Sequence, residues 1–176
     1  AGVGGPRRAR AGGWWGRGSW SRVSGVELWG RGEGAEEGGQ AREAGVTAEL
    51  IARGVWVGTA ADEGGAYDLV IRVDDEFYRL QVKTAYDGKS DGAVEFRTRS
   101  VRTKSDGYER EGYDGKIDYF AALNVRTEEV YLVSIDDAGS AVTTIRYEPA
   151  ANNNRANVNW HAEYRLDTVL DELRSG

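Results

Sequence analysis

The chain has 176 residues, enough for one domain with a hydrophobic core and too few for two domains of ordinary size. It contains no cysteine, which excludes disulfides, thiolate zinc sites and thiol nucleophiles. Its single histidine, His161, excludes paired-histidine metal motifs, so any catalysis must rely mainly on carboxylates, amides, lysine and a hard metal ion. No run of apolar residues approaches the roughly 18 that a membrane span requires, and the N-terminus lacks an apolar signal-peptide core. We therefore expect a soluble, cytoplasmic protein that does not enter a membrane.

Charge is distributed unevenly along the chain. Residues 1–40 carry six arginines and four glutamates, whereas residues 41–176 carry 25 acidic residues against 13 arginines and four lysines, a net charge of −8. This balance disfavours nucleic-acid binding on bulk charge alone. A halophilic host would explain it, because charges are screened within about 3 Å at 1 M salt. We hold this as a hypothesis that equal stability at low and multimolar KCl would refute.

The first 40 residues differ in composition from the rest of the chain. They contain 13 of the 25 glycines and four of the six tryptophans, without helical or strand periodicity. The sequence therefore predicts a disordered or adventitious leader over residues 1–40 and one domain over residues 41–176. A tail of arginine, tryptophan and glycine could also stack on nucleic acid and neutralise it, as single-strand binders do.

The predicted elements of the domain begin with a helix over Ala41–Arg53. It places Ala44, Thr47, Ala48 and Ile51 on one face, and Gly54 follows it as a C-cap glycine. Short apolar stretches bounded by turn residues predict strands at Val55–Val57, Tyr67–Val73, Phe77–Thr84, Ala93–Thr98, Ile117–Val125 and Val130–Val133. An amphipathic helix is predicted over Tyr164–Leu173. The order indicates an α+β fold, with polar loops over residues 99–115 and 150–159 that are candidates for binding loops.

The stretch from Tyr67 to Thr84 is predicted to form a hairpin around Asp74-Asp75. If Val73 opposes Glu76, then Asp68 lies opposite Gln81. The apolar side chains would share one face, namely Leu69, Ile71, Val73, Tyr78, Leu80 and Val82. The other face would carry the polar set, namely Asp68, Arg72, Arg79, Gln81 and Lys83. Directly opposed residues have Cβ atoms only about 4.5 to 5.5 Å apart, so a carboxylate, an amide and an ammonium converge.

This polar set suits Mg²⁺, a hard cation that takes oxygen ligands and keeps several waters for a phosphate substrate. Asp68 would be the anionic ligand, and Gln81 and the backbone carbonyl of Val82 would add neutral oxygens. Lys83 would stabilise charge developing on a phosphate or orient the attacking water. Glu43, on the predicted first helix, could complete the site from the side.

The pattern of Glu43 on a helix, Asp68 on one strand and Gln81-Val82-Lys83 on the next resembles the PD-(D/E)XK nuclease superfamily. In particular, it is similar to the branch of homing endonucleases associated with group I introns, in which glutamine replaces the second acidic residue. The resemblance extends from about Ala41 to Tyr164 and includes the segments Tyr113–Phe120 and Asn152–Trp160. Tyr67 stands where the signature proline of the family would be.

The resemblance implies a restriction-endonuclease-like fold with a central mixed β-sheet flanked by helices. It also implies Mg²⁺-dependent hydrolysis of double-stranded DNA, with Mn²⁺ as a possible substitute, by a dimer or tetramer of identical chains. Asp68, Gln81, Lys83 and Glu43 would be catalytic, and Asp68, Gln81, Val82 and Glu43 would hold the metal. Two alternatives stay open: a catalytically silent DNA-binding or assembly module that retains the fold, and a nuclease acting on branched DNA or RNA.

Two groups of residues are candidates for contacts with DNA. The basic run Arg97, Arg99, Arg102 and Lys104 could contact phosphates, or could belong to an ordinary solvated hairpin. Within the asparagine-rich stretch, Asn153 and Arg155 could read base edges, although asparagine clusters are also turn formers. For the site itself, the alternative is a solvated sheet face with a salt bridge worth under about 1 kcal/mol.

Overall fold

The structure is a computed structural model that describes residues 35–60, 65–89, 91–104, 107–149 and 158–176. Most of the predicted leader, residues 1–34, lies outside the described residues, as do Asn153 and Arg155. Within the described part of the chain, no helix is long and apolar enough to cross a membrane.

Helix α1 runs from Ala35 to Ala52 and ends in a tight glycine cap. Gly54 has φ +74°, and the cap hydrogen bonds run from Gly54 N–H to the Ile51 carbonyl and from Val55 N–H to the Leu50 carbonyl. These two bonds define a Schellman motif, in which the left-handed residue is usually glycine because it lacks a Cβ atom. Val55 and Leu50 are both buried, which adds the hydrophobic contact typical of this cap. The predicted C-cap glycine is therefore present.

The predicted apolar face of α1 is wrong. Ala44, Ala48 and Ile51 are exposed, with Ile51 at 59% exposure, and the buried residues of the described helix are Val46 and Leu50. The helix carries alanine, glycine and valine on several sides, so size decides which side packs on the sheet. Leucine and valine bury more apolar surface than alanine, and the side that holds Val46 and Leu50 is the one that packs.

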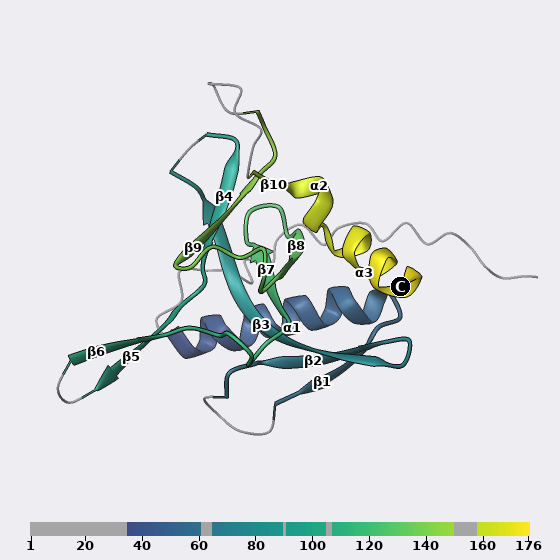
Figure 1. The fold of residues 1–176 in the computed structure, drawn as a ribbon, viewed down its shortest axis with the longest axis horizontal. Coiled ribbons are helices and arrows are strands. Elements are labelled where there is room, and N and C mark those ends of the chain that lie inside the picture. Colours follow the sequence, from purple (N-terminus) through teal and green to yellow (C-terminus); the bar gives the residue numbers. More distant parts are fainter. Residues whose placement is uncertain (1–34, 61–64, 90, 105–106, 150–157) are drawn as a thin grey trace, which may run out of the picture.

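The described strands form an eight-stranded mixed sheet and a separate hairpin. Along the main path the strands are β1 (Trp56–Thr59), β2 (Leu69–Val73), β3 (Glu76–Asp87), β4 (Ala93–Arg97), β9 (Val142–Arg146) and β10 (Asn159–Trp160). Off this path, β7 (Tyr119–Asn124) pairs in parallel with β3 and antiparallel with β8 (Val130–Ser134). The hairpin consists of β5 (Ser100–Lys104) and β6 (Gly107–Glu111) and projects from the body in Figure 1. This architecture confirms the predicted α+β fold with a mixed sheet flanked by helices.

The register of the β2–β3 hairpin is the predicted one. Val73 pairs with Glu76 and Leu69 with Leu80, so Asp74 and Asp75 form a two-residue connection. Asp74 takes the positive φ of 52° that such a tight connection requires. The apolar positions of both strands point to the same side, where they pack together in one core cluster. Because side chains alternate along a strand, this register places Gln81 and Lys83 on the opposite side.

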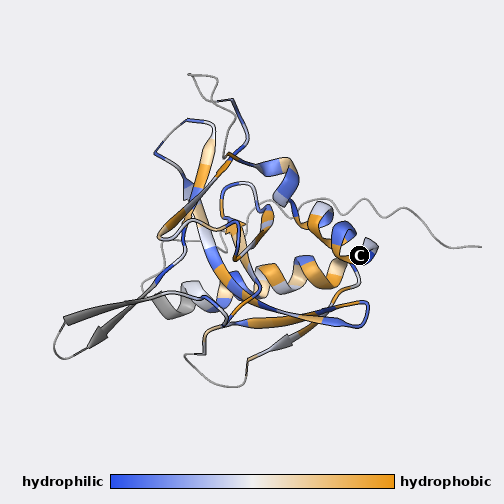
Figure 2. Ribbon diagram, in the orientation of Figure 1, coloured by the Kyte–Doolittle hydropathy of each residue, from blue (hydrophilic) through white to orange (hydrophobic). Residues whose placement is uncertain are grey.

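Two helices cover the apolar side of this hairpin. Val46 and Leu50 of α1 pack there with Leu166, Val169 and Leu170 of α3, which spans Leu166–Ser175. A short helix, α2 (His161–Tyr164), precedes α3. A second cluster, centred on Phe96, Phe120, Tyr131 and Ile145, fills the space between β3, β4, β7, β8 and β9. Figure 2 shows apolar residues in α1, in α3 and in the central strands, and Figure 1 shows the long strand β3 running from the β2 end of the sheet to the β4 end.

The predicted order of elements needs correction at three places. The stretch 99–115 is not simply a loop, because it contains the β5–β6 hairpin, whose mostly polar sequence lacks the apolar runs used to recognise strands. Strand β9 was not predicted, since only Val142 and Ile145 are apolar in it, yet Ile145 is fully buried. The closing helix divides at Arg165, where φ −61° and ψ 142° interrupt the helical backbone. Of the predicted loop over residues 150–159, only 158 and 159 are described.

Candidate active site

A gap in the pairing of β3 creates the candidate site. On one edge β3 pairs with β2 as far as Leu80 and with β4 from Tyr86, and between these points residues 81–85 are paired only by β7 on the other edge. The backbone of this stretch is therefore open towards the space between β2 and β4. Asp68 lies just before β2, at the edge of this gap.

One oxygen of Asp68 accepts two hydrogen bonds across the gap. Its Oδ2 accepts a bond from the Gln81 side-chain amide and another from the Val82 backbone N–H at 2.7 Å. Asp68 also donates its own N–H to the Leu80 carbonyl at 2.8 Å, which extends the ladder by one bond. The predicted juxtaposition of Asp68 and Gln81 is thus present, although Asp68 lies outside the strand proper.

The backbone carbonyl of Val82 opens into the same gap. The N–H and the carbonyl of a residue in a strand point to the same edge, and the Val82 N–H is directed at Asp68. The Gln81 amide nitrogen lies 3.5 Å from this carbonyl oxygen. A carboxylate, a side-chain amide and a backbone carbonyl therefore meet at three adjacent positions of the paired strands.

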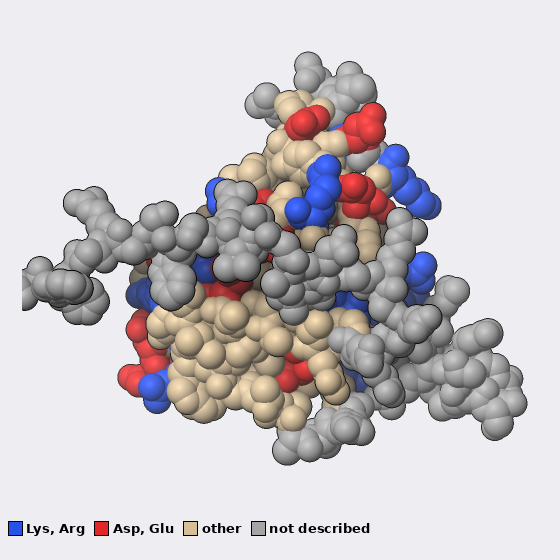
Figure 3. Space-filling model, turned by 180° about the vertical axis from the view of Figure 1, so that it is seen from behind, with Lys and Arg blue, Asp and Glu red and all other residues tan. Residues whose placement is uncertain are grey.

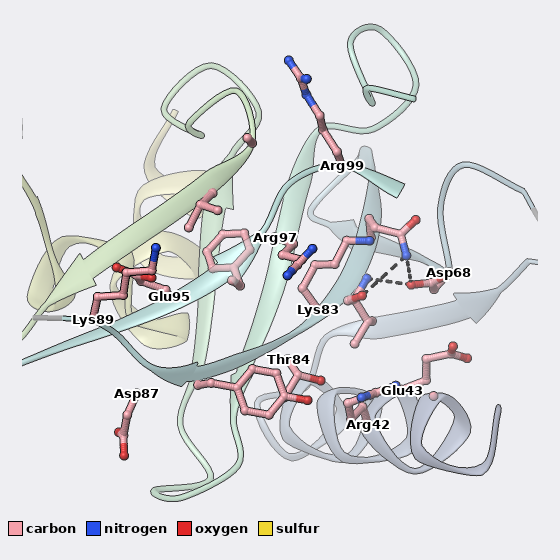
Figure 4. Close-up of a pocket in the computed structure, with 17 residues that line it drawn as sticks. Arg42, Glu43, Asp68, Lys83, Thr84, Asp87, Lys89, Glu95, Arg97 and Arg99 are labelled. Carbon is pink, nitrogen blue, oxygen red and sulfur yellow. Dashed lines mark hydrogen bonds between the residues drawn. The ribbon is translucent and has the colours of Figure 1, made fainter. Parts of the chain in front are cut away.

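Glu43 approaches the gap from α1, next to Arg42, as Figure 4 shows. Burial raises the pKa of the Glu43 carboxyl above its ordinary value, and the negative charge of Asp68 raises it further, while Arg42 lowers it. Burial also raises the pKa of Asp68, against the lowering effects of the Val82 N–H, Lys83 and Arg42. The negative charge of Asp68 thus acts on the Glu43 carboxyl, and a cation placed between the two carboxylates would relieve this repulsion.

Lys83 lies on the polar side of β3, as predicted, but its contact was not predicted. Its Nζ donates a hydrogen bond of 2.8 Å to the hydroxyl of Tyr113, a buried residue at 7% exposure. Tyr113 is 30 residues away in the sequence and belongs to the segment before β7. Only the tertiary fold brings the two residues together. A signal was present in the sequence, because Tyr113 begins one of the segments on which the family resemblance rests.

An open groove of about 750 Å³ surrounds these residues. Its lining includes the five candidate catalytic and metal-binding residues. It also includes basic and acidic side chains on β3, on β4 and next to these strands, namely Lys89, Arg97, Arg99, Asp87 and Glu95. In Figure 4, Lys83 and Asp68 converge on one region, and Arg99 extends away from it. Figure 3 shows side chains of both signs over the end of the molecule that holds β4 and β9. The groove is therefore lined by five basic and four acidic side chains, so its charge is nearly balanced within an acidic protein.

The predicted DNA-contacting residues have different outcomes. Arg97 and Arg99 are exposed and line the groove. Arg102 and Lys104 lie on β5, and the structure describes only their backbone. Asp118, within the segment Tyr113–Phe120, binds Arg79: its two oxygens accept bonds from the guanidinium at 2.8 and 3.1 Å and from the backbone N–H at 2.7 Å. Asp118 is therefore a structural residue that joins β3 to β7.

The donor set fits a hard divalent cation better than a soft one. Glu43 and Asp68 could supply carboxylate oxygens, and the Gln81 side chain and the Val82 carbonyl could supply neutral ones, the ligand types that Mg²⁺, Ca²⁺ and Mn²⁺ prefer. In the described ranges, no group of three or more histidine, cysteine or acidic residues could hold a metal ion. Gln81 stands where a third acidic residue would complete such a group, so the site carries one negative charge fewer.

The fold and the site together define a class. A mixed sheet flanked by helices, with a carboxylate, a glutamine and a lysine at an open strand edge, is a restriction-endonuclease-like architecture. The family model of the PD-(D/E)XK endonucleases matches residues 35–167, and the chain belongs to this family. The match covers the whole site, from Glu43 on α1 to Tyr113 and beyond.

A solved structure supports the same fold. The structure of a bacterial homing endonuclease, I-Ssp6803I, aligns with a TM-score of 0.63 at 19% sequence identity, covering 81% of this chain and 97% of that one. At this identity the likeness concerns the fold. A comparison with curated proteins finds no match.

Proposed function

We propose that this chain is a Mg²⁺-dependent endonuclease that hydrolyses phosphodiester bonds of double-stranded DNA. The observation that carries the proposal is the Asp68 carboxylate, fixed by Gln81 and the Val82 N–H in an open groove beside Lys83. Membership of the PD-(D/E)XK endonuclease family supports hydrolysis by a nuclease. The similar fold of a bacterial homing endonuclease supports DNA as the substrate.

Asp68, Glu43, Gln81 and the Val82 carbonyl would hold the metal ion. Mn²⁺ would be accepted as well, because the ligands are all oxygens. A divalent ion held there would supply Lewis-acid polarisation of the scissile phosphate and neutralise part of its charge. Binding requires the Gln81 amide to turn, since its nitrogen, and not its oxygen, now faces Asp68. The strand backbone keeps the Val82 carbonyl in place.

Lys83 would stabilise the negative charge that develops on the phosphate. Its ammonium lies at the wall of the groove on the same side of β3 as Gln81, two residues further along the strand. A positioned cation in a site that is partly shielded from water stabilises such charge more strongly than a solvated one. Deprotonation of the attacking water would require a base, and the carboxylates beside the phosphate are the nearest candidates.

Arg97, Arg99 and Lys89 would contact backbone phosphates along the groove. They follow one another around the turn from β3 to β4 and into the β5–β6 hairpin, whose own Arg102 and Lys104 extend the same run. Such contacts position a duplex without reading its sequence. Because the protein is acidic overall, these local contacts would have to outweigh repulsion from the rest of the surface. Each phosphate contact would release counterions from the DNA, so added salt would weaken these contacts.

We also propose that the protein is a homo-oligomer. Two large aromatic side chains, Trp56 and Phe77, are more than half exposed and contact each other edge to face at 6.1 Å. Exposed apolar groups of this size favour burial against another surface. Light scattering on the wild type and on Phe77→Glu tests this, and a monomeric wild type would contradict it.

A catalytically silent DNA-binding module is the second candidate, favoured by Gln81 and the missing third acidic residue. Calorimetric titration with Mg²⁺ and Mn²⁺ separates the two functions. The nuclease should bind metal in a manner that Asp68→Ala abolishes. A silent module should give no metal-dependent heat.

The cleavage test uses supercoiled plasmid with Mg²⁺ and the variants Asp68→Ala and Lys83→Ala. Asp87→Ala is the matched control, because Asp87 is an exposed carboxylate that lines the same groove away from the gap. We expect nicking by the wild type and the control, and none by the two site variants or in EDTA. Nicking that persists in both site variants would overturn the assignment.

A further inference from the structure

The hydrogen bond between Lys83 and Tyr113 has features that an incidental surface contact lacks. The phenol oxygen of Tyr113 accepts the bond at 2.8 Å, and the tyrosine side chain is almost fully buried. Lysine has a long flexible stem, so a solvated lysine on a sheet face samples many positions. In this protein a hydrogen bond to a buried hydroxyl holds the end of the Lys83 side chain.

Tyr113 is itself held by the second core cluster. Its ring packs edge to face on Phe120 with 5.4 Å between centroids, and Phe120 is fully buried. Its carbonyl accepts a hydrogen bond of 2.9 Å from Lys116 N–H, which closes the turn before β7. Gly115 provides the positive φ of 69° in that turn. The position of the hydroxyl is thus set by the core and by a closed turn.

The chemical nature of the acceptor distinguishes this contact from an ion pair. Where the fold requires a fixed cation for structure, as at Arg79, a carboxylate holds it and neutralises its charge. Tyr113 is a neutral acceptor, so it orients Lys83 and leaves the positive charge available. An ammonium has three donors, and a single bond to the phenol leaves two for a substrate.

We propose that Tyr113 is a positioning residue that holds the Lys83 ammonium at the wall of the groove for contact with the scissile phosphate. The proposal rests on the proposed function of Lys83. A preset cation avoids reorganisation when negative charge develops, which is the condition for effective electrostatic stabilisation. Loss of the hydroxyl should therefore affect the chemical step more than substrate binding.

Tyr113→Phe tests the proposal, because it keeps the ring packed on Phe120 and removes only the hydroxyl. The matched control is Tyr131→Phe. Tyr131 is a buried tyrosine of the same cluster whose hydroxyl contacts Glu129 at 3.0 Å, away from the groove. We expect Tyr113→Phe to lower kcat about 10- to 100-fold, as the loss of one hydrogen bond to a charged group predicts, with KM changed by less than about twofold. Tyr131→Phe should leave both constants within about twofold of the wild type.

A second measurement does not depend on cleavage. The chain has four lysines, so the side-chain methylene signals of Lys83 can be assigned by NMR using Lys83→Arg. Relaxation of these signals should show a more ordered Lys83 end group in the wild type and in Tyr131→Phe than in Tyr113→Phe. If the wild type cleaves nothing, the proposed function fails, and this measurement still decides whether Tyr113 orders Lys83.

The two readouts can overturn the positioning role separately. Unchanged kcat in Tyr113→Phe, while Lys83→Ala abolishes cleavage, would show that the hydroxyl does not act through Lys83. Equal mobility of Lys83 in all three proteins would show that the contact does not order it.

Discussion

Gln81→Glu should destabilise the protein less in the presence of a divalent ion than in its absence. Without metal, the substitution replaces the amide that donates to Asp68 by a second carboxylate in a position only 8% exposed. The lost hydrogen bond to a charged group costs about 1.5 to 3 kcal/mol. Repulsion between two carboxylates about 4 Å apart adds up to about 4 kcal/mol at an effective dielectric constant near 20, although sharing a proton relieves much of it.

We therefore expect Gln81→Glu to lower the free energy of unfolding by about 2 to 5 kcal/mol in EDTA at pH 8. In Mg²⁺ the added carboxylate becomes a ligand, and every tenfold gain in metal affinity returns about 1.4 kcal/mol at saturating ion. The penalty should shrink or disappear.

Urea denaturation with and without Mg²⁺ measures both values. Gln81→Met is the control, because it removes the same hydrogen bond without adding charge. It also removes one proposed metal ligand, so its penalty should stay the same or grow in Mg²⁺, and should not shrink. A penalty for Gln81→Glu that is equal in EDTA and in Mg²⁺ would refute the reasoning that places a cation beside Asp68 and Gln81.

Three further predictions concern the fold. Gly54→Ala should destabilise the protein by about 1 kcal/mol in denaturation experiments, because φ is +74° there while no atom lies within 4 Å of the added Cβ; an unchanged midpoint would contradict the cap. Leu50→Ala should lower the free energy of unfolding by about 2 to 5 kcal/mol and Ile51→Ala by under about 0.5 kcal/mol. A larger loss for Ile51→Ala would instead support the helix face predicted from the sequence. Asp118→Asn should cost about 1 kcal/mol at pH 7. Since Arg79 holds the pKa of Asp118 below its ordinary value, wild-type Asp118 contributes stability above that ordinary value and loses it as pH falls through the lowered pKa, so the two urea curves should converge in acid.

The register of the β2–β3 hairpin could be predicted from the sequence because two independent constraints agree there. A two-residue connection fixes the pairing, and the period of two fixes which side chains share a face, so Asp68 and Gln81 had to meet. Helix α1 offered no comparable constraint. Its alanines and glycines distinguish the sides poorly, and only packing against the sheet selects Val46 and Leu50 over Ala48 and Ile51.

Contacts between segments that are distant in the sequence could not be predicted by counting residues, as the hairpin register could. The bond from Lys83 to Tyr113 and the bidentate pairing of Arg79 with Asp118 both depend on β7 lying parallel to β3. Two parallel strands must be joined by a long crossover connection. The local sequence of a strand does not show which distant strand pairs with it, or at which edge. The gap between β2 and β4 has the same origin, since β3 is long enough to pair with both strands and leaves residues 81–85 open between them.

The central claim is that the gap at Asp68 cuts DNA with the help of a divalent ion. The most direct test incubates the protein with a library of duplexes of random sequence in Mg²⁺, then captures and sequences newly formed 5′-phosphate ends, so that no target site need be known. We predict new ends with the wild type and with Asp87→Ala, and none with Asp68→Ala or in EDTA. Equal recovery of ends from the wild type and from Asp68→Ala would contradict the account.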